Sequence, residues 1–197
     1  MPNWCNNTIT LTGPKEKISA IYAKAVEDNA LLQQLKPMPE ALEDTTSPAP
    51  KEGKVQPLVD GFDNWYDWRV QNWGTKWDVD VDNLELSEDG TTITGWFDSA
   101  WAPPIHAYEY FLTDNEDCSI KSYYYEGGMD FGGLWEDFAD AEVTISDFTS
   151  DEMEDPNNGL IYDLDQHFNF SDYVREYEEE QKTETEKFIV DKETVNA

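Results

Sequence analysis

The alternation of hydrophobic and polar residues predicts four β-strands in this chain. Side chains of a strand point in turn to opposite faces, so a half-buried strand alternates in steps of two residues. The stretches that follow this pattern are residues 5–12, 77–86, 91–101 and 118–126. Gly13-Pro14 closes the first stretch, and the turn sequence Ser-Glu-Asp-Gly at 87–90 joins the second and third into a hairpin.

Apolar residues at helical spacing predict helices between these strands. Ile18, Ile21 and Tyr22 recur in steps of three or four after the first strand, and residues 105–112 follow the helix-start signal Pro103-Pro104 in the same way. The order is therefore strand, helix, strand, strand, helix, strand. We predict an α+β fold of the ferredoxin-like or split βαβ type, with one antiparallel sheet and its helices on one face.

In this topology the first and last strands are antiparallel neighbours. Cys5 and Cys118 each stand at the start of a strand, so we expect them at opposite ends of the pair and predict no disulfide. The N-terminal sequence lacks the layout of a signal peptide, and no apolar run approaches the length of a membrane span. We therefore expect a soluble cytoplasmic protein that does not enter a membrane.

The predicted ferredoxin-like domain covers residues 1–135 and contains a long insertion at residues 36–74. Five prolines within Pro37–Pro57 exclude a helix or a central strand there and indicate a loop. The rest of the insertion has the pattern of a short aromatic helix, with Asp63 as its N-cap and Gly74 as its C-terminal stop.

Residues 136–197 form an acidic C-terminal extension, with a helix expected near residues 171–190 that opens at Ser171 as its N-cap. The whole chain has 43 acidic and 13 basic residues, a net charge of −30. Residues 1–57 hold 7 acids and 6 bases, which leaves 36 acids and 7 bases, net −29, for residues 58–197. This balance excludes ordinary nucleic-acid binding, because contacts to phosphate need lysine and arginine.

Several strings of the sequence resemble one protein family. They are M-P-N-W-C-N-N-T-I-T-L-T-G (1–13), P-M-P-E-A-L (37–42), W-Y-D-W-R-V-Q-N-W-G-T-K-W-D (65–78), S-A-W-A-P-P (99–104) and Y-Y-E-G-G-M-D-F-G-G (124–133). In this order they resemble the YubB-like ferredoxin-like domain family of phages and conjugative plasmids, over roughly residues 1–135. The resemblance implies a ferredoxin-like fold and a mobile-element origin, but no reaction and no catalytic residues.

Motifs for metal binding or catalysis are weak. Asp78, Asp80 and Asp82 have the spacing that opens an EF-hand calcium loop, but Asn83 replaces the required glycine and Asp89 replaces the bidentate glutamate. The two histidines of the chain stand in no nucleophile or metal motif. We therefore predict neither an enzyme nor a metal site, and no cofactor.

The acidic residues suggest a role in binding. On a strand over residues 77–86, Asp78, Asp80 and Asp82 would form a regular row of charge about 6.8 Å apart. We therefore expect a phage- or plasmid-encoded inhibitor that mimics nucleic acid in the basic groove of a host defence protein, such as a restriction, CRISPR or related nuclease complex. Its partner-binding acids would be Asp78, Asp80, Asp82, Glu85, Asp130, Glu136, Asp137, Asp140, Glu176, Glu179 and Glu180.

Two other functions remain open at this point. The aromatic residues could instead line a pocket that sequesters a nucleotide signal, with Arg69, Trp73, Lys76, Trp77 and Trp101 as its residues. Alternatively, the acidic C-terminal helix could attach a scaffold protein to a phage or replication complex. Direct nucleic-acid binding is not expected in any of these cases, and homodimerisation stays open.

Overall fold

The computed structural model describes residues 3–48 and 55–195, with side chains up to residue 184. The chain forms two compact units that divide between Glu142 and Val143. The loop predicted for Pro37–Pro57 falls partly on residues 49–54, which lie outside the described residues.

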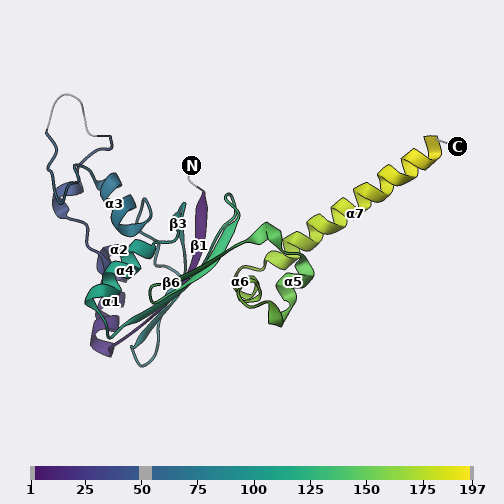
Figure 1. The fold of residues 1–197 in the computed structure, drawn as a ribbon. Coiled ribbons are helices and arrows are strands. Elements are labelled where there is room, and N and C mark those ends of the chain that lie inside the picture. The colour runs from purple at the N-terminus through teal and green to yellow at the C-terminus, as the bar shows by residue number, and fades with distance from the viewer. Residues whose placement is uncertain (1–2, 49–54, 196–197) are drawn as a thin grey trace. The chain divides into compact units, whose positions relative to one another are not determined.

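One six-stranded sheet forms the centre of the first unit, in the order β2-β3-β1-β4-β5-β6 (Figure 1). The strands are β1 (Trp4–Thr12), β2 (Leu84–Leu86), β3 (Thr92–Ala100), β4 (Ser119–Glu126), β5 (Phe131–Glu136) and β6 (Ala139–Thr144). β1 is antiparallel to both of its neighbours, β3 and β4. This central strand is therefore held by backbone hydrogen bonds on both sides.

Helices α1, α2 and α4 lie together on one face of this sheet (Figure 1). The helices of the unit are α1 (Lys15–Asp28), α2 (Leu32–Leu35), α3 (Trp65–Trp73) and α4 (Ile105–Asp114), with a 3-10 turn η1 (Glu40–Leu42). Alternate residues of β1, from Cys5 to Leu11, are buried in the same core as Ile18 of α1, Leu32 of α2 and Tyr108 of α4. The apolar side chains at every second position of the strand thus pack against the apolar faces of the helices in one hydrophobic layer.

The α+β class and the antiparallel sheet with its helices are confirmed. The pairing of the first and last predicted strands is also confirmed, since Cys5 stands opposite Glu126 and Thr12 stands opposite Ser119. Cys118 directly precedes β4, so the two cysteines lie at opposite ends of the β1-β4 pair, and both are free thiols.

The sequence did not predict the hairpin of β5 and β6, and its glycines explain why. Gly132 and Gly133 interrupt the alternation of β5 and suggest a turn. In the structure a Cβ at position 133 would collide with the Tyr124 ring and come within 2.6 Å of the Ala141 carbonyl oxygen. Glycine is required there by a neighbouring ring and backbone, and not by a turn.

The N-cap predicted for the aromatic helix was wrong by one residue. Asn64, and not Asp63, precedes α3 in an extended conformation, and its side-chain oxygen accepts the Asp67 N–H at 2.9 Å. A side chain one residue earlier does not cap this turn, because an N-cap bonds the backbone two or three residues ahead of it. The predicted stop at Gly74 is confirmed by its left-handed conformation, with φ of 86°.

The second unit is helical. It contains α5 (Ser150–Glu154), α6 (Leu160–Phe168) and α7 (Phe170–Val195), with 3-10 turns η2 (Ile145–Asp147) and η3 (Pro156–Asn158). Ser171 lies inside α7 and donates its hydroxyl to Asp165 at 2.9 Å, so its prediction as an N-cap was wrong. Within the ranges that the structure describes, no helix is both long enough and apolar enough to cross a membrane.

We expect Gly95→Ala to lower the free energy of unfolding by about 2 kcal/mol, because the new methyl would collide with the Asn83 carbonyl and separate β2 from β3. Urea unfolding followed by circular dichroism measures this. Gly61→Ala is the control, since Gly61 also has a positive φ but no atom within 4 Å of the new methyl. Equal losses in the two variants would show that the close approach of the strands has no energetic weight.

We also expect Cys5 to resist alkylation in the folded protein. Burial raises the pKa of the Cys5 thiol to about 12, so almost no thiolate forms at pH 8. Treatment with iodoacetamide at pH 8 should label the half-buried Cys118 first and Cys5 only in urea, as read by peptide mass. Labelling of native Cys5 as fast as Cys118 would contradict the placement of Cys5 in the core.

Candidate functional site

Asp78, the first residue of the predicted acidic row, holds the fold together. Its carboxylate accepts the backbone N–H groups of Leu32 and Gln33, each at 2.8 Å, and so caps the start of α2. It also accepts the N–H of Val79 at 2.8 Å. Burial raises the pKa of Asp78, and these hydrogen bonds act in the opposite direction by stabilising the carboxylate. This side chain is not available to a partner.

The strand predicted over residues 77–86, and with it the row of three aspartates, was therefore wrong. Only Leu84–Leu86 pairs with β3. Val79 and Val81 are buried as predicted, and Asp80 and Asp82 are exposed, but the backbone between them turns, with the Asp82 N–H bonded to the Asp80 carboxylate at 2.9 Å. Alternating burial does not need a strand, because a bent segment held at Asp78 buries the same valines.

Other acids of the first unit divide into structural and exposed groups. Asp137 accepts the Ile120 N–H at 2.9 Å and the Ser119 hydroxyl at 2.8 Å, and Asp140 accepts the Tyr124 hydroxyl at 2.7 Å. Asp130 is half-buried with a positive φ of 60°. The exposed acids among those predicted in this unit are Asp80, Asp82, Glu85, Glu136, Asp137 and Asp140, of which the last two carry the hydrogen bonds described above. They lie on different segments and do not form a row.

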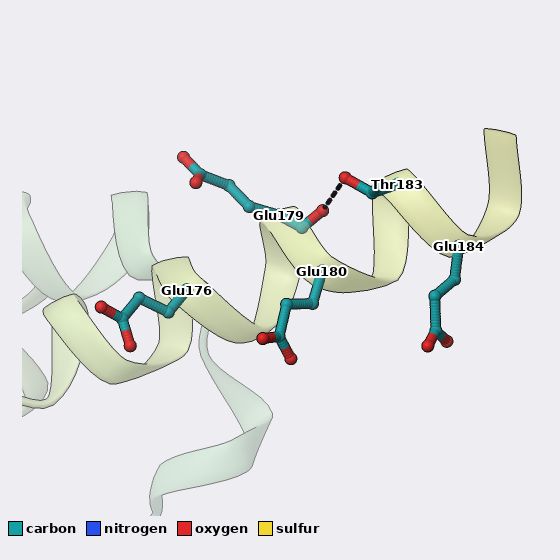
Figure 2. Close-up of a pocket in the computed structure, with 5 residues that line it drawn as sticks. All are labelled: Glu176, Glu179, Glu180, Thr183 and Glu184. Carbon is teal, nitrogen blue, oxygen red and sulfur yellow. Dashed lines mark hydrogen bonds between the residues drawn. The ribbon is translucent and has the colours of Figure 1, made fainter. Parts of the chain in front are cut away.

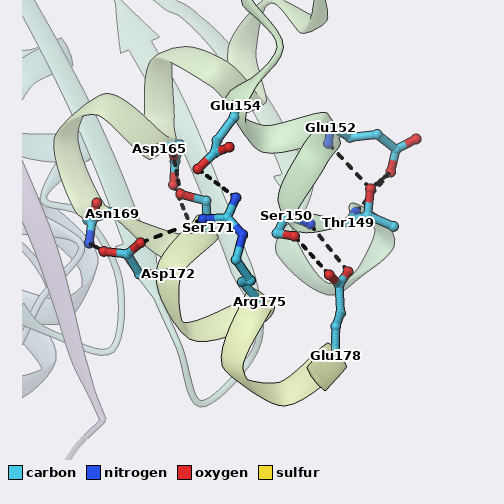
Figure 3. A network of polar contacts seen from close by, with 10 residues as sticks. All are labelled: Thr149, Ser150, Glu152, Glu154, Asp165, Asn169, Ser171, Asp172, Arg175 and Glu178. Carbon is cyan, nitrogen blue, oxygen red and sulfur yellow. Dashed lines mark hydrogen bonds and ion pairs between the residues drawn. The ribbon is translucent and has the colours of Figure 1, made fainter. Parts of the chain in front are cut away.

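The acids of the second unit separate in the same way (Figure 3). Glu178 faces α5, where it accepts the hydroxyl of Ser150 at 2.8 Å, and Glu154 binds Arg175 at 2.7 Å. Asp165 accepts both polar hydrogens of Ser171. These carboxylates pack the three helices together, so they serve the fold.

Among the residues whose side chains the structure describes, a row of carboxylates without ion pairs lies along α7. Figure 2 shows Glu176, Glu180 and Glu184 along one side of the helix, with Glu179 on another side. Steps of four residues advance about 6 Å along a helix, so the spacing is regular. The hollow of about 700 Å³ beside them is lined by α7 alone, so it is the open groove of one helix and not an enclosed cavity. Glu184 was not predicted, although the spacing 176, 180, 184 would have identified it.

The five residues of the predicted aromatic pocket fall into two groups, Arg69 with Trp73 and Lys76 with Trp77 and Trp101, and do not line one pocket. Trp73 is completely buried and donates its indole N–H to the Lys36 carbonyl at 2.8 Å. The Arg69 guanidinium stacks on the rings of Trp65 and Trp73, at 5.2 and 4.9 Å from their centroids. Lys76 lies against a different group of rings, 4.3 Å from the centroid of Trp77. The two cations are each occupied by their own aromatic neighbours and do not converge on one ligand.

A different cavity, of about 470 Å³, lies beside the edge of β3. Its lining residues are Trp4, Trp77, Asp78, Asp80, Asn83, Trp96, Phe97, Asp98, Ser99 and Ala100. Trp4 and Trp96 are 49% and 56% exposed, which is unusual for the most hydrophobic ring system. The sequence contained a signal for Trp96, because alternation places it on the polar face of its strand with Thr94 and Asp98.

A hollow of about 370 Å³ contains His106 together with Glu109, Asp140 and Glu142. The His106 Nδ1 lies 3.0 Å from the Gln71 carbonyl oxygen, so it carries a proton and donates, which leaves Nε2 as the only free base. Serine, threonine and cysteine are absent from the lining residues of this hollow. Across the described ranges, no group of three or more His, Cys, Asp or Glu residues is arranged to hold a metal ion.

Comparison with known proteins gives little further information. No family model matches this chain, and no curated protein matches it. Among solved structures, it is similar to the crystal structure of the protein api92 from Yersinia pseudotuberculosis (DUF1281). The TM-score is 0.40 and the identity 11%, over 73% of this chain and 98% of that chain.

We expect Asp78→Ala to lower the free energy of unfolding by about 2 kcal/mol, because it removes the acceptor of two backbone N–H groups at the start of α2. Asp82→Ala, at an exposed acid four residues on, should change it by less than about 0.5 kcal/mol. Urea denaturation of both variants measures the difference. Equal free energies of unfolding of the two variants would show that Asp78 does not stabilise the fold.

Proposed function

We propose that this protein is a non-enzymatic, phage- or plasmid-encoded inhibitor of a host defence system. It acts in the host cytoplasm and places its acidic surface in the nucleic-acid groove of a restriction, CRISPR or related nuclease complex. The observation that carries this proposal is the row of Glu176, Glu180 and Glu184 on α7. Within the described part of the chain none of the three makes an ion pair, so their charge is available to a basic partner.

The row of Glu176, Glu180 and Glu184 lowers the stability of α7 in the isolated protein. Like charges four residues apart on a helix destabilise it by about 0.2–0.5 kcal/mol a pair. Some other acids of the second unit have partners, as Glu154 has Arg175 and Glu178 has Ser150. A basic groove would remove the repulsion and displace the counterions of the glutamates, as it displaces those of phosphates in nucleic acid. The unpaired row is therefore the best candidate for the mimicking surface.

The membership of a YubB-like family, and with it a mobile-element origin, is part of the same proposal and rests on the resemblance of the sequence. The order β2-β3-β1-β4 with antiparallel neighbours, and helices α1 and α4 in the crossovers, supports the proposal of a ferredoxin-like domain. We propose that the first unit is such a domain of the YubB-like family, extended by β5 and β6. The alternative of a nucleotide-sequestering module is weakened, because the cavity at Trp77 is lined by carboxylates that repel phosphate.

The test compares wild-type protein with a variant that carries Glu176→Gln, Glu180→Gln and Glu184→Gln. Each is immobilised and exposed to host lysate, and captured proteins are released by duplex DNA and identified by mass. We expect wild type to capture nucleic-acid-binding proteins that DNA elutes, and the variant to bind them at least about tenfold more weakly, because three ionic contacts are lost.

The matched control carries Asp82→Asn, Glu85→Gln and Glu136→Gln, which changes the net charge equally at exposed sites of the first unit. It should capture the same proteins as wild type. If both triple variants lose binding equally, overall charge and not the α7 row is responsible. If DNA fails to elute the captured proteins, the acidic helix serves as a scaffold contact and mimicry is wrong.

A further inference from the structure

The cavity beside β3 lies where the outer edge of that strand, opposite β1, pairs with no strand of the described residues. The β2-β3 ladder stops at the pair Leu84 and Gly95, while β3 continues to Ala100. At its far end the Thr75 hydroxyl accepts the Ala100 N–H at 2.9 Å and donates to the Ala100 carbonyl at 3.0 Å. The strand between these two points, residues 96–99, forms one wall of the cavity.

The backbone of this wall can accept another strand. In an antiparallel sheet the N–H and C=O groups of each residue point to the same neighbouring side of the strand. Residues two apart therefore point these groups to the same side. Ala100 faces Thr75 on the outer side, so Trp96 and Asp98 also direct their backbone groups outward. An open edge of this kind is the usual site at which an extended peptide adds to a sheet.

The side chains of the cavity select a cation. Three indoles line it, from Trp4, Trp77 and Trp96, and the face of an indole attracts a positive charge. Asp80 and Asp98 add carboxylates, and Asp98 already accepts the Asn6 amide at 2.6 Å, which fixes its position. Lysine, arginine and histidine are absent from the lining residues, so nothing in the lining would repel a cation.

A cation of this protein's own is already held by indole rings elsewhere in the first unit. The Arg69 guanidinium lies between the rings of Trp65 and Trp73. A guanidinium is planar and weakly hydrated, so it stacks on indoles and binds a carboxylate at its edge better than an ammonium does. Lys76 contacts one ring of the cavity, Trp77, but is not a lining residue, and Trp4 and Trp96 remain exposed.

We propose that this cavity binds an arginine side chain of a partner protein, presented by an extended segment that adds to the open edge of β3 at residues 96–99. The volume of about 470 Å³ lies within the range of roughly 300–1,000 Å³ that small-ligand sites have. The site belongs to the first unit and uses none of the glutamates of α7. It therefore stands whether or not the α7 row mimics nucleic acid.

The test uses the full-length protein and the peptide acetyl-Thr-Val-Arg-Val-Thr-amide, beside the same peptide with citrulline, the neutral isostere of arginine. Binding is followed by the indole N–H signals in nitrogen-15 NMR spectra. We expect the arginine peptide to shift the signals of Trp4, Trp77 and Trp96 and to bind about tenfold more tightly than the citrulline peptide. The indoles of the buried Trp73 and Trp135 should not respond.

Variants separate the cavity from general attraction to an acidic protein. Trp96→Ala and Asp98→Asn should each weaken binding of the arginine peptide by about fivefold to tenfold. Phe138→Ala and Glu85→Gln are the controls, since Phe138 is also 56% exposed, Glu85 is an exposed acid, and neither lines the cavity. Both controls should bind as wild type does.

Three results would overturn the proposal. They are equal affinity for the arginine and citrulline peptides, unchanged affinity in Trp96→Ala, and the absence of indole shifts at millimolar peptide. Circular dichroism of each variant verifies folding, and the shifts in wild type test the site without any substitution. Loss of the α7 glutamates should leave peptide binding intact, so failure here and failure of nucleic-acid mimicry are distinguishable.

Discussion

The hydrogen bonds of the Asp78 carboxylate to the start of α2 determine how the segment between α3 and β2 runs. Because the segment is held there, it turns instead of continuing as a strand, and it buries Val79 and Val81 against the core. The β2-β3 ladder then begins only at Leu84, which leaves the last part of β3 open. The Asp78 carboxylate thus prevents the predicted row of aspartates and leaves open the space that forms the cavity beside β3.

A net charge of −30 opposes a compact fold, and the structure shows how the chain uses part of that charge. Asp78, Asp137 and Asp165 each accept at least one backbone N–H group. Such a hydrogen bond stabilises a carboxylate better than water does only where the protein fixes the geometry. Glu178 and Glu154 bind α5 and α7 together. Among the residues whose side chains the structure describes, Glu176, Glu180 and Glu184 form a row on α7 without ion pairs, and we propose that this row binds a partner.

The sequence predicted those parts of the fold that depend on local periodicity. β1, α1, α4 and β4 were located because each obeys one period and has a clear turn or cap at its end. The predictions failed where a contact between residues far apart in the sequence determines the local structure. Asp78 bonds to residues more than 40 positions away, and Gly133 accommodates Tyr124 of the neighbouring strand. The exposure of Trp96 follows from the alternation of β3, but the cavity beside it depends on where the β2-β3 ladder stops, which periodicity does not encode.

We propose that the α7 row occupies the space that DNA or RNA takes on a basic partner. The most direct measurement is the affinity of a captured partner for duplex DNA at increasing concentrations of this protein, by fluorescence anisotropy. We expect the apparent dissociation constant for DNA to rise in proportion to the concentration of this protein, with no ternary complex. An unchanged DNA affinity, with all three components bound together, would contradict it.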